Sequence, residues 1–200
     1  MASPLSRLEL LRAGIKRGSE LKTHKRPSDQ TWGLRALLGR LTLLCGNGRV
    51  SAAASVIAAA QRLHEPCAWL VERGFEPYGP DLEAAGITLD SLVFIRLPEH
   101  QKLGRAADLI ARTGGVGLIV IDTEKAPHRA MLRRLANHAE KHSMATLILC
   151  ENAHHDAAIS LVAQAEYKPS GEQSLTAMRD RNQPNLWQVS ERYDAVPGCP

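Results

Sequence analysis

The chain has 200 residues, of which 44% are hydrophobic and 23% charged, which suits one α/β domain with extensions. Only two Phe, three Tyr and three Trp are present, so we expect an aliphatic, alanine-rich core and no aromatic platform for stacking single-stranded bases. The net charge of +4 is unevenly placed: residues 1–40 hold nine basic and three acidic residues, and the rest hold 16 basic and 18 acidic residues.

The longest apolar stretch, Ala52 to Ala60, is interrupted by Ser55 and is far shorter than the roughly 20 residues of a membrane helix. The N-terminus has no continuous apolar segment of the kind found in signal peptides. Four cysteines occur without a C-x-x-C pair, which favours free thiols in a reducing compartment. We therefore expect a cytoplasmic protein without a membrane partner.

The first 34 residues are predicted to form a separate arm. Apolar residues recur at helical spacing over residues 4–17, which predicts a short amphipathic helix with basic residues around the stripe. Polar residues 18–30 read as a linker, so the helix could dock on another protein or on its own domain. The basic arm could also make a weak contact with DNA, although a solvated basic face is equally consistent with this composition. The candidate partner-binding residues are Leu5, Leu8, Leu11, Arg12 and Ile15.

Strands and helices alternate from Leu37 onward. Strands are predicted at 41–45, 68–72, 92–97, 117–122 and 145–150, with helices at 51–63, 80–85, 99–113 and 127–142. Such alternation predicts right-handed crossovers and a mainly parallel sheet flanked by helices. Antiparallel edge strands are expected within 157–167, 175–178 and 186–189. The predicted core therefore covers residues 35–190, and residues 191–200 are expected to be a disordered tail.

A glycine turn joins the first predicted strand to the first long helix. A phosphate-binding P-loop occupies this position and reads G-x-x-x-x-G-K-[ST], because backbone N–H groups must surround the phosphates while a lysine and a hydroxyl bind phosphate and Mg²⁺. Here one residue separates Gly46 from Gly48, Arg49 stands in place of the lysine, Val50 replaces the hydroxyl, and Ser51 follows. The residues that would hold a nucleotide are thus largely substituted.

Three stretches, Val56–Glu72, Leu89–Ala126 and Leu132–Asn152, resemble successive elements of the RecA recombinase core. The resemblance covers roughly residues 35–190 and implies a RecA-like α/β fold. It puts Asp122 at the Walker B position, Asn152 where RecA has a nucleotide-sensing glutamine, and Glu72 or Arg73 near the carboxylate that activates water. The turn Arg179–Asn182 is similar to a basic turn late in the same fold.

The departures from RecA predict a protein that is not an enzyme. Too few residues separate Asp122 from Leu132, or Asn152 from Ala157, for the two DNA-binding loops of a recombinase. ATP hydrolysis needs the phosphate cradle, the metal ligand and the water activator together. We therefore expect no catalytic residues, no cofactor and no metal, and only a remnant nucleotide site formed by Gly46, Gly48, Arg49, Ser51, Asp122 and Asn152.

A RecA-like core with these losses and a short N-terminal helix resembles the ImuA type of accessory protein in damage-induced translesion mutagenesis. That resemblance implies a non-catalytic role in the SOS response. Its implied partners are RecA, reached through the N-terminal helix, and an inactive Y-family polymerase of ImuB type with its associated error-prone polymerase. Leu8, Leu11 and Ile15 are the expected anchors, since amphipathic helices commonly bind grooves through such positions.

Two alternative functions remain open from the sequence. A cell-division inhibitor of SulA type is also RecA-like without a nucleotide site. An NAD(P)-binding Rossmann enzyme is the second, because Gly46 to Ser51 is one residue from G-x-G-x-x-G and Glu72 ends the next strand, where a ribose-binding carboxylate would lie.

Three weaker signals have simple structural explanations. Asp122 could cap the next helix or end the sheet instead of marking a Walker B site. His154 and His155 could suggest a metal, although adjacent residues point in opposite directions and a loop pair fits better. The basic residues of helix 128–142 could contact DNA phosphates, or they could form a solvated face.

Overall fold

A computed structural model describes residues 32–74, 76–168, 171–183 and 185–192. The predicted amphipathic helix with Leu5, Leu8, Leu11, Arg12 and Ile15 lies outside the described residues, as does most of the predicted tail. The division into arm, core and tail therefore stays a prediction.

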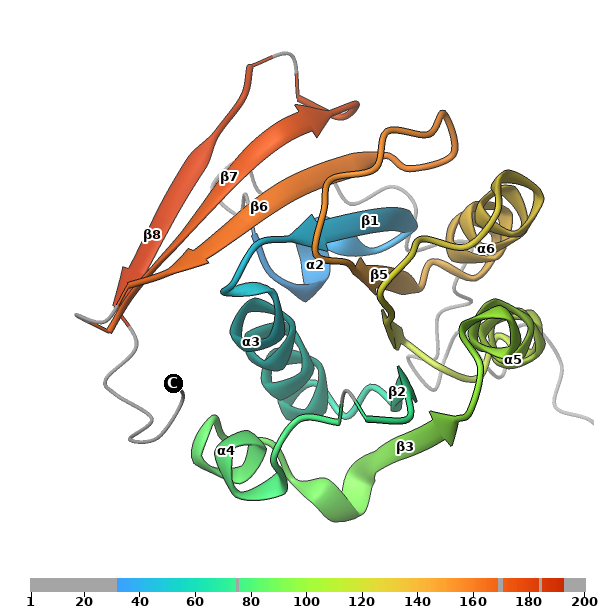
Figure 1. Ribbon diagram of the computed structural model, residues 1–200, viewed down its shortest axis with the longest axis horizontal. Coiled ribbons are helices and arrows are strands. Elements are labelled where there is room, and N and C mark those ends of the chain that lie inside the picture. The colour runs from blue at the N-terminus through green and yellow to red at the C-terminus, as the bar shows by residue number, and fades with distance from the viewer. Residues whose placement is uncertain (1–31, 75, 169–170, 184, 193–200) are drawn as a thin grey trace, which may run out of the picture.

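The described chain forms one eight-stranded sheet in the order β3-β2-β4-β5-β1-β6-β7-β8 (Figure 1). The first six strands of this order pair in parallel, and β7 and β8 continue the sheet in antiparallel pairing. The strands are β1 (Arg40–Cys45), β2 (Cys67–Glu72), β3 (Leu92–Leu97), β4 (Leu118–Asp122), β5 (Ala145–Leu149), β6 (Leu161–Tyr167), β7 (Glu172–Asp180) and β8 (Gln188–Arg192).

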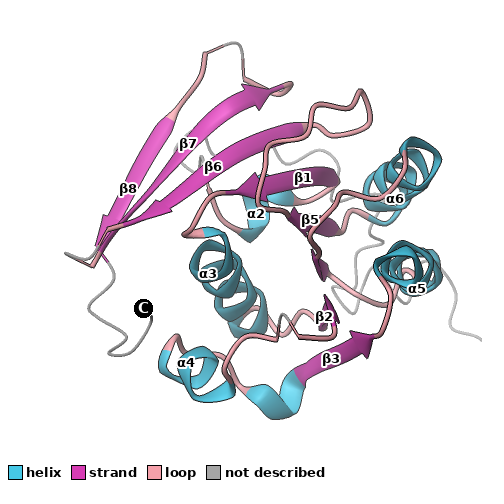
Figure 2. Cartoon of the chain, in the orientation of Figure 1, coloured by secondary structure: helices cyan, strands magenta, loops and turns pink. Residues whose placement is uncertain are grey.

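Helices cover both faces of the parallel part of the sheet (Figure 2). They are α2 (Leu34–Leu37), α3 (Arg49–Arg62), α4 (Gly79–Ala84), the 3₁₀ turn η2 (Leu89–Ser91), α5 (His100–Thr113) and α6 (Arg129–His142). One core joins α2, α3 and α4 to the sheet, and the other joins α5 and α6 to the opposite face. The strands β1, β4 and β5 are buried throughout, as expected for parallel strands between two helical layers.

The predicted fold class is confirmed in its mainly parallel sheet, flanking helices and antiparallel C-terminal strands. The predicted bounds of the C-terminal strands were partly wrong. Residues 157–160 form a turn instead of the start of β6, because the Asp156 carboxylate accepts a hydrogen bond from the Ala158 N–H at 2.7 Å. The strand β7 is longer than predicted, and α2 and η2 were not anticipated.

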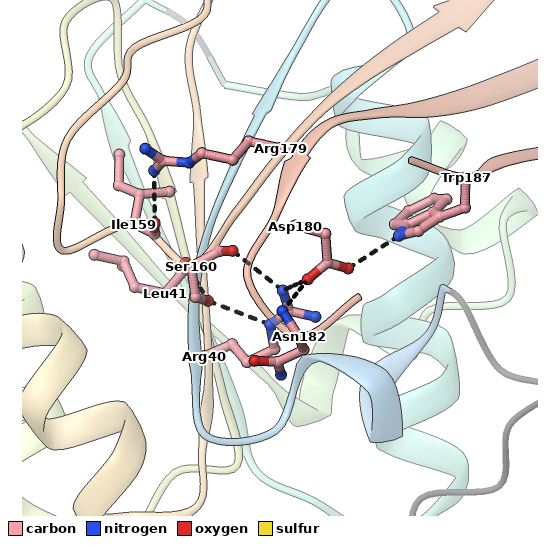
Figure 3. Close-up of polar contacts among 8 residues, drawn as sticks. All are labelled: Arg40, Leu41, Ile159, Ser160, Arg179, Asp180, Asn182 and Trp187. Atoms are coloured by element: carbon pink, nitrogen blue, oxygen red, sulfur yellow. Dashed lines mark hydrogen bonds and ion pairs between the residues drawn. The ribbon is translucent and has the colours of Figure 1, made fainter. Parts of the chain in front are cut away.

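A buried ion pair ties the antiparallel strands to β1 (Figure 3). The Arg40 guanidinium pairs with the Asp180 carboxylate, and both side chains are almost fully buried. Arg40 also donates from Nε to Ser160 Oγ at 3.2 Å, while Trp187 Nε1 donates to the second Asp180 oxygen at 3.0 Å. Burial alone would raise the pKa of Asp180, but the hydrogen bonds from Trp187 and Arg40 outweigh it and hold the pKa below its ordinary value.

Residues of the segment Arg179–Asn182 take part in these structural contacts. The Arg179 guanidinium donates to the carbonyl oxygens of Asp156 at 2.7 Å and Ile159 at 2.6 Å, which holds the segment that leads into β6. Arg179 and Asp180 are therefore structural residues in the described part of the molecule.

Candidate functional site

The glycine turn lies directly against the backbone of β6. Gly46 has φ +91°, and a Cβ atom at this residue would meet the Ala165 carbonyl oxygen at 2.2 Å. A Cβ at Gly48 would lie 3.1 Å from backbone atoms of Glu166 and Tyr167. Both glycines are therefore required for the close approach of two backbones, which is one of the main uses of glycine.

Hydrogen bonds close this contact along its length. The Gly48 N–H donates to the Ala165 carbonyl oxygen at 3.1 Å. The Asn47 side chain pairs with the backbone of Tyr167, accepting from its N–H at 2.9 Å and donating to its carbonyl oxygen at 3.2 Å. From β7, the buried Gln173 amide donates to the Gly48 carbonyl oxygen at 2.9 Å. The turn is therefore hydrogen-bonded to both β6 and β7.

Two backbone donors of this turn are directed at the protein. A phosphate cradle requires successive backbone N–H groups that point at the ligand. Here the Gly48 N–H is bonded to β6 and the Arg49 N–H to the Gly46 carbonyl oxygen at 3.3 Å. The sequence did not reveal the roles of Asn47 and Gln173, since the contact to Tyr167 spans 120 residues and the contact to Gln173 spans 125.

Arg49 folds back over the turn at the start of α3. Its Nη1 donates to the Gly46 carbonyl oxygen at 3.2 Å, and its Nε is buried without a hydrogen-bond partner among the described residues. Val50 and Ser51 are in the first turn of α3, where Val50 packs against the core and Ser51 is half-buried. The residues at the P-loop lysine and hydroxyl positions therefore contact protein groups.

Asp122 ends β4 and is 5% exposed. Burial raises its pKa from 3.8 to about 6, and the positive charge of Arg49 opposes this rise. Asp122 does not cap the next helix, because α6 begins after His128 without a side-chain cap. Burial, followed by the Asp122 charge, also raises the pKa of the Cys150 thiol to about 12, so this thiol stays protonated.

Glu72, which the RecA resemblance also singled out, and Asn152 of the predicted remnant site are only partly brought together with Asp122. Glu72 ends β2, the strand next to β4, so it shares a sheet edge with Asp122, and its Oε2 is buried without a hydrogen-bond partner among the described residues. Asn152 is exposed in the bend after β5. Two acidic residues, Glu72 and Asp122, thus end neighbouring strands of the sheet.

The strand order excludes the dinucleotide-binding alternative. In a Rossmann fold the glycine-rich strand neighbours the strand that carries the ribose-binding carboxylate. Here β4 and β5 both lie between β1 and β2, which separates the glycine turn from Glu72 by roughly 14 Å at the usual strand spacing. A nucleotide bound as in a Rossmann enzyme could not reach both.

The connections that follow β4 and β5 are short. The link from β4 to α6 spans only residues 123–128, and the link from β5 to β6 spans residues 150–160. His154 and His155 are exposed in the second link, and no cluster of metal-ligating side chains occurs within the described residues.

Arg134 and His138 of α6 contact Asp108 of α5, so part of the basic helix interacts with the protein itself.

Within the described residues, no helix is long and apolar enough to cross a membrane.

No family model and no curated protein matches the chain. Among solved structures, the crystal structure of the RadB recombinase is similar, with a TM-score of 0.60 and 17% sequence identity. The match covers 78% of this chain and 88% of the RadB chain. At this identity the similarity establishes the fold, and the chain has a RecA-like α/β core.

The close approach of the turn to β6 predicts the effect of Gly46→Ala. The new methyl group would collide with the Ala165 carbonyl oxygen, so we expect a loss of roughly 2–4 kcal/mol in the free energy of unfolding, measured by urea denaturation. Gly86→Ala is the matched control, because Gly86 has φ +83° and nothing within 4 Å of its Cβ position. Equal losses in the two variants would show that backbone strain, and not the contact with β6, determines the effect.

Burial of Asp122 predicts a pH-dependent gain of stability in Asp122→Asn. The folded-state pKa of about 6 lies above the ordinary 3.8, so ionisation opposes folding fully above pH 6 and this penalty disappears as the pH falls below about 4. We expect the free energy of unfolding of the variant to exceed that of the natural protein by about 1–3 kcal/mol at pH 7.5. Near pH 4 the two values should be equal. Asp90→Asn, at an exposed residue, is the control. A constant difference across this pH range would contradict the assigned pKa.

Proposed function

We propose that this protein is a non-catalytic RecA-like accessory factor of damage-induced translesion synthesis, of the ImuA type. It would act by binding other proteins, without binding or hydrolysing ATP. The observation that carries the proposal is the glycine turn, whose backbone is hydrogen-bonded to β6 at the position where a RecA-like ATPase holds phosphate.

The altered site also supports a role without a metal-bound nucleotide. In ATPases of this kind, Mg²⁺ and the phosphates supply the charges opposite the Walker B carboxylate. In this chain Arg49 supplies a positive charge that acts on Asp122, which is mostly ionised at neutral pH because its pKa is about 6. A cation of the protein itself therefore acts on this carboxylate.

The proposed interaction with RecA rests on the N-terminal arm. Its apolar stripe, with Leu8, Leu11 and Ile15 as anchors, is suited to a hydrophobic groove on a RecA protomer. The core or the C-terminal tail would then remain free to contact the inactive Y-family polymerase of ImuB type. The SulA-type alternative predicts binding to a cell-division filament instead, and no feature of the described residues favours it.

Titration of the intact chain into RecA tests this proposal. We expect saturable binding that is lost in a chain lacking residues 1–30 and weakened at least tenfold by Leu8→Asp with Leu11→Asp, since each change places a charge in the apolar stripe. Ser6→Asp with Ala13→Asp, which fall opposite the apolar stripe at helical spacing, is the charge-matched control and should retain most of the binding.

Binding that survives deletion of residues 1–30 would move the interface to the core. Failure of the intact chain to bind RecA, together with binding to a cell-division protein, would replace the proposal with the SulA-type alternative.

A further inference from the structure

A groove of about 800 Å³ lies between α5, α6 and the chain that leads into α6. It is on the face of the sheet opposite α3, where α5 and α6 run side by side (Figure 1). The two helices approach closely at Gly104, since a Cβ there would meet Met131 Cγ at 3.0 Å. Neither Asp122 nor any residue of the glycine turn lines this groove.

Positive charge dominates its walls. Arg105 and Arg112 on α5 and Lys125 before α6 are exposed, and none of them forms an ion pair with a described acidic residue. Arg134 contributes a fourth cation from α6. Unpaired cations that converge on one concave surface attract a ligand of opposite charge.

The one carboxylate among the lining residues is already neutralised. Asp108 is 3% exposed and accepts hydrogen bonds from Arg134 through both of its oxygens, the Nε contact being 3.0 Å. His138 Nε2 lies 3.2 Å from the same carboxylate. This bidentate pair positions Arg134 at the groove and leaves no free negative charge among the lining residues to repel an acidic ligand.

An apolar strip runs between the cations. Leu109 is 50% exposed and lies on the same face of α5 as Arg105 and Arg112, four residues after the first and three before the second. The half-buried Pro127 and Met131 lie on the α6 side of the groove. A ligand that fits this surface needs acidic groups with an apolar group between them.

We propose that this groove binds an acidic peptide segment of a partner protein, with an apolar residue against Leu109 and carboxylates at Arg105, Arg112 and Lys125. The chain's own N-terminal residues 1–31 are a poor occupant, because they hold seven basic and three acidic residues. The inference goes beyond the proposed function, since it concerns a surface distinct from the N-terminal helix.

Nucleic acid fits the groove less well. Single strands are commonly held by aromatic side chains that stack on bases, and the lining contains no Phe, Tyr or Trp. Duplex DNA is read by elements that project into its grooves, whereas this surface is concave and has Leu109 between its arginines.

Fluorescence anisotropy with the full chain tests the inference. The probe is a labelled peptide of Asp, Glu and Ala with one central Leu, and labelled oligo-dT is the nucleic-acid comparison. We expect saturable, salt-sensitive peptide binding that weakens at least tenfold in Arg105→Glu with Arg112→Glu, because like charges would then face each other. Leu109→Ala should weaken binding several-fold at any salt concentration.

The matched control is Arg62→Glu with Arg133→Glu, which makes the same charge change at exposed residues outside the groove and should lose little affinity. Circular dichroism of each variant verifies that it is folded. Equal losses in the groove and control variants, absence of peptide binding, or tighter binding of oligo-dT than of the peptide would each overturn the inference. RecA binding through residues 1–30 is measured separately, so either proposal can fail alone.

Discussion

The contact between the Gly46–Gly48 turn and the backbone of β6 determines what this RecA-like core can do. Two glycines allow the backbones to touch, and the side chains of Asn47 and Gln173 fasten the turn from β6 and β7. Buried or bonded N–H groups are costly to release, since each lost hydrogen bond leaves an unpaired polar group. A phosphate that bound the Gly48 N–H would first have to break its hydrogen bond to the Ala165 carbonyl oxygen.

The same contact supports the glycine turn from within the protein, through β6 and β7. The buried pair of Arg40 and Asp180 anchors these strands to β1, so the antiparallel extension and the glycine turn are supported together. Near the turn, the positive charge of Arg49 partly offsets the effect of burial on the pKa of Asp122.

Much of this architecture follows from local sequence. The strands β1 to β5 were predicted to within one residue, because β1, β4 and β5 are near-continuous apolar runs buried on both faces. The substitution of the P-loop lysine and hydroxyl positions was also predicted from Arg49 and Val50. The contact between the turn and β6 was not predicted, since it depends on hydrogen bonds from Asn47 and Gln173 across more than a hundred residues. The groove between α5 and α6 likewise depends on how these two helices pack, with Gly104 against Met131. The start of β6 was missed because a local Asp156 turn overrides the apolar pattern.

An amide-resolved titration of the full chain with Mg-ATP tests most directly whether the turn can accept a nucleotide. We expect the backbone N–H signals of Gly48 and Arg49 to stay unchanged into the millimolar range, because both donors are bonded within the protein. Their hydrogen exchange should also be slow and independent of ATP. Saturable shifts of these two signals with a micromolar Kd would show that the turn opens to bind phosphate, and would contradict a non-catalytic, nucleotide-free core.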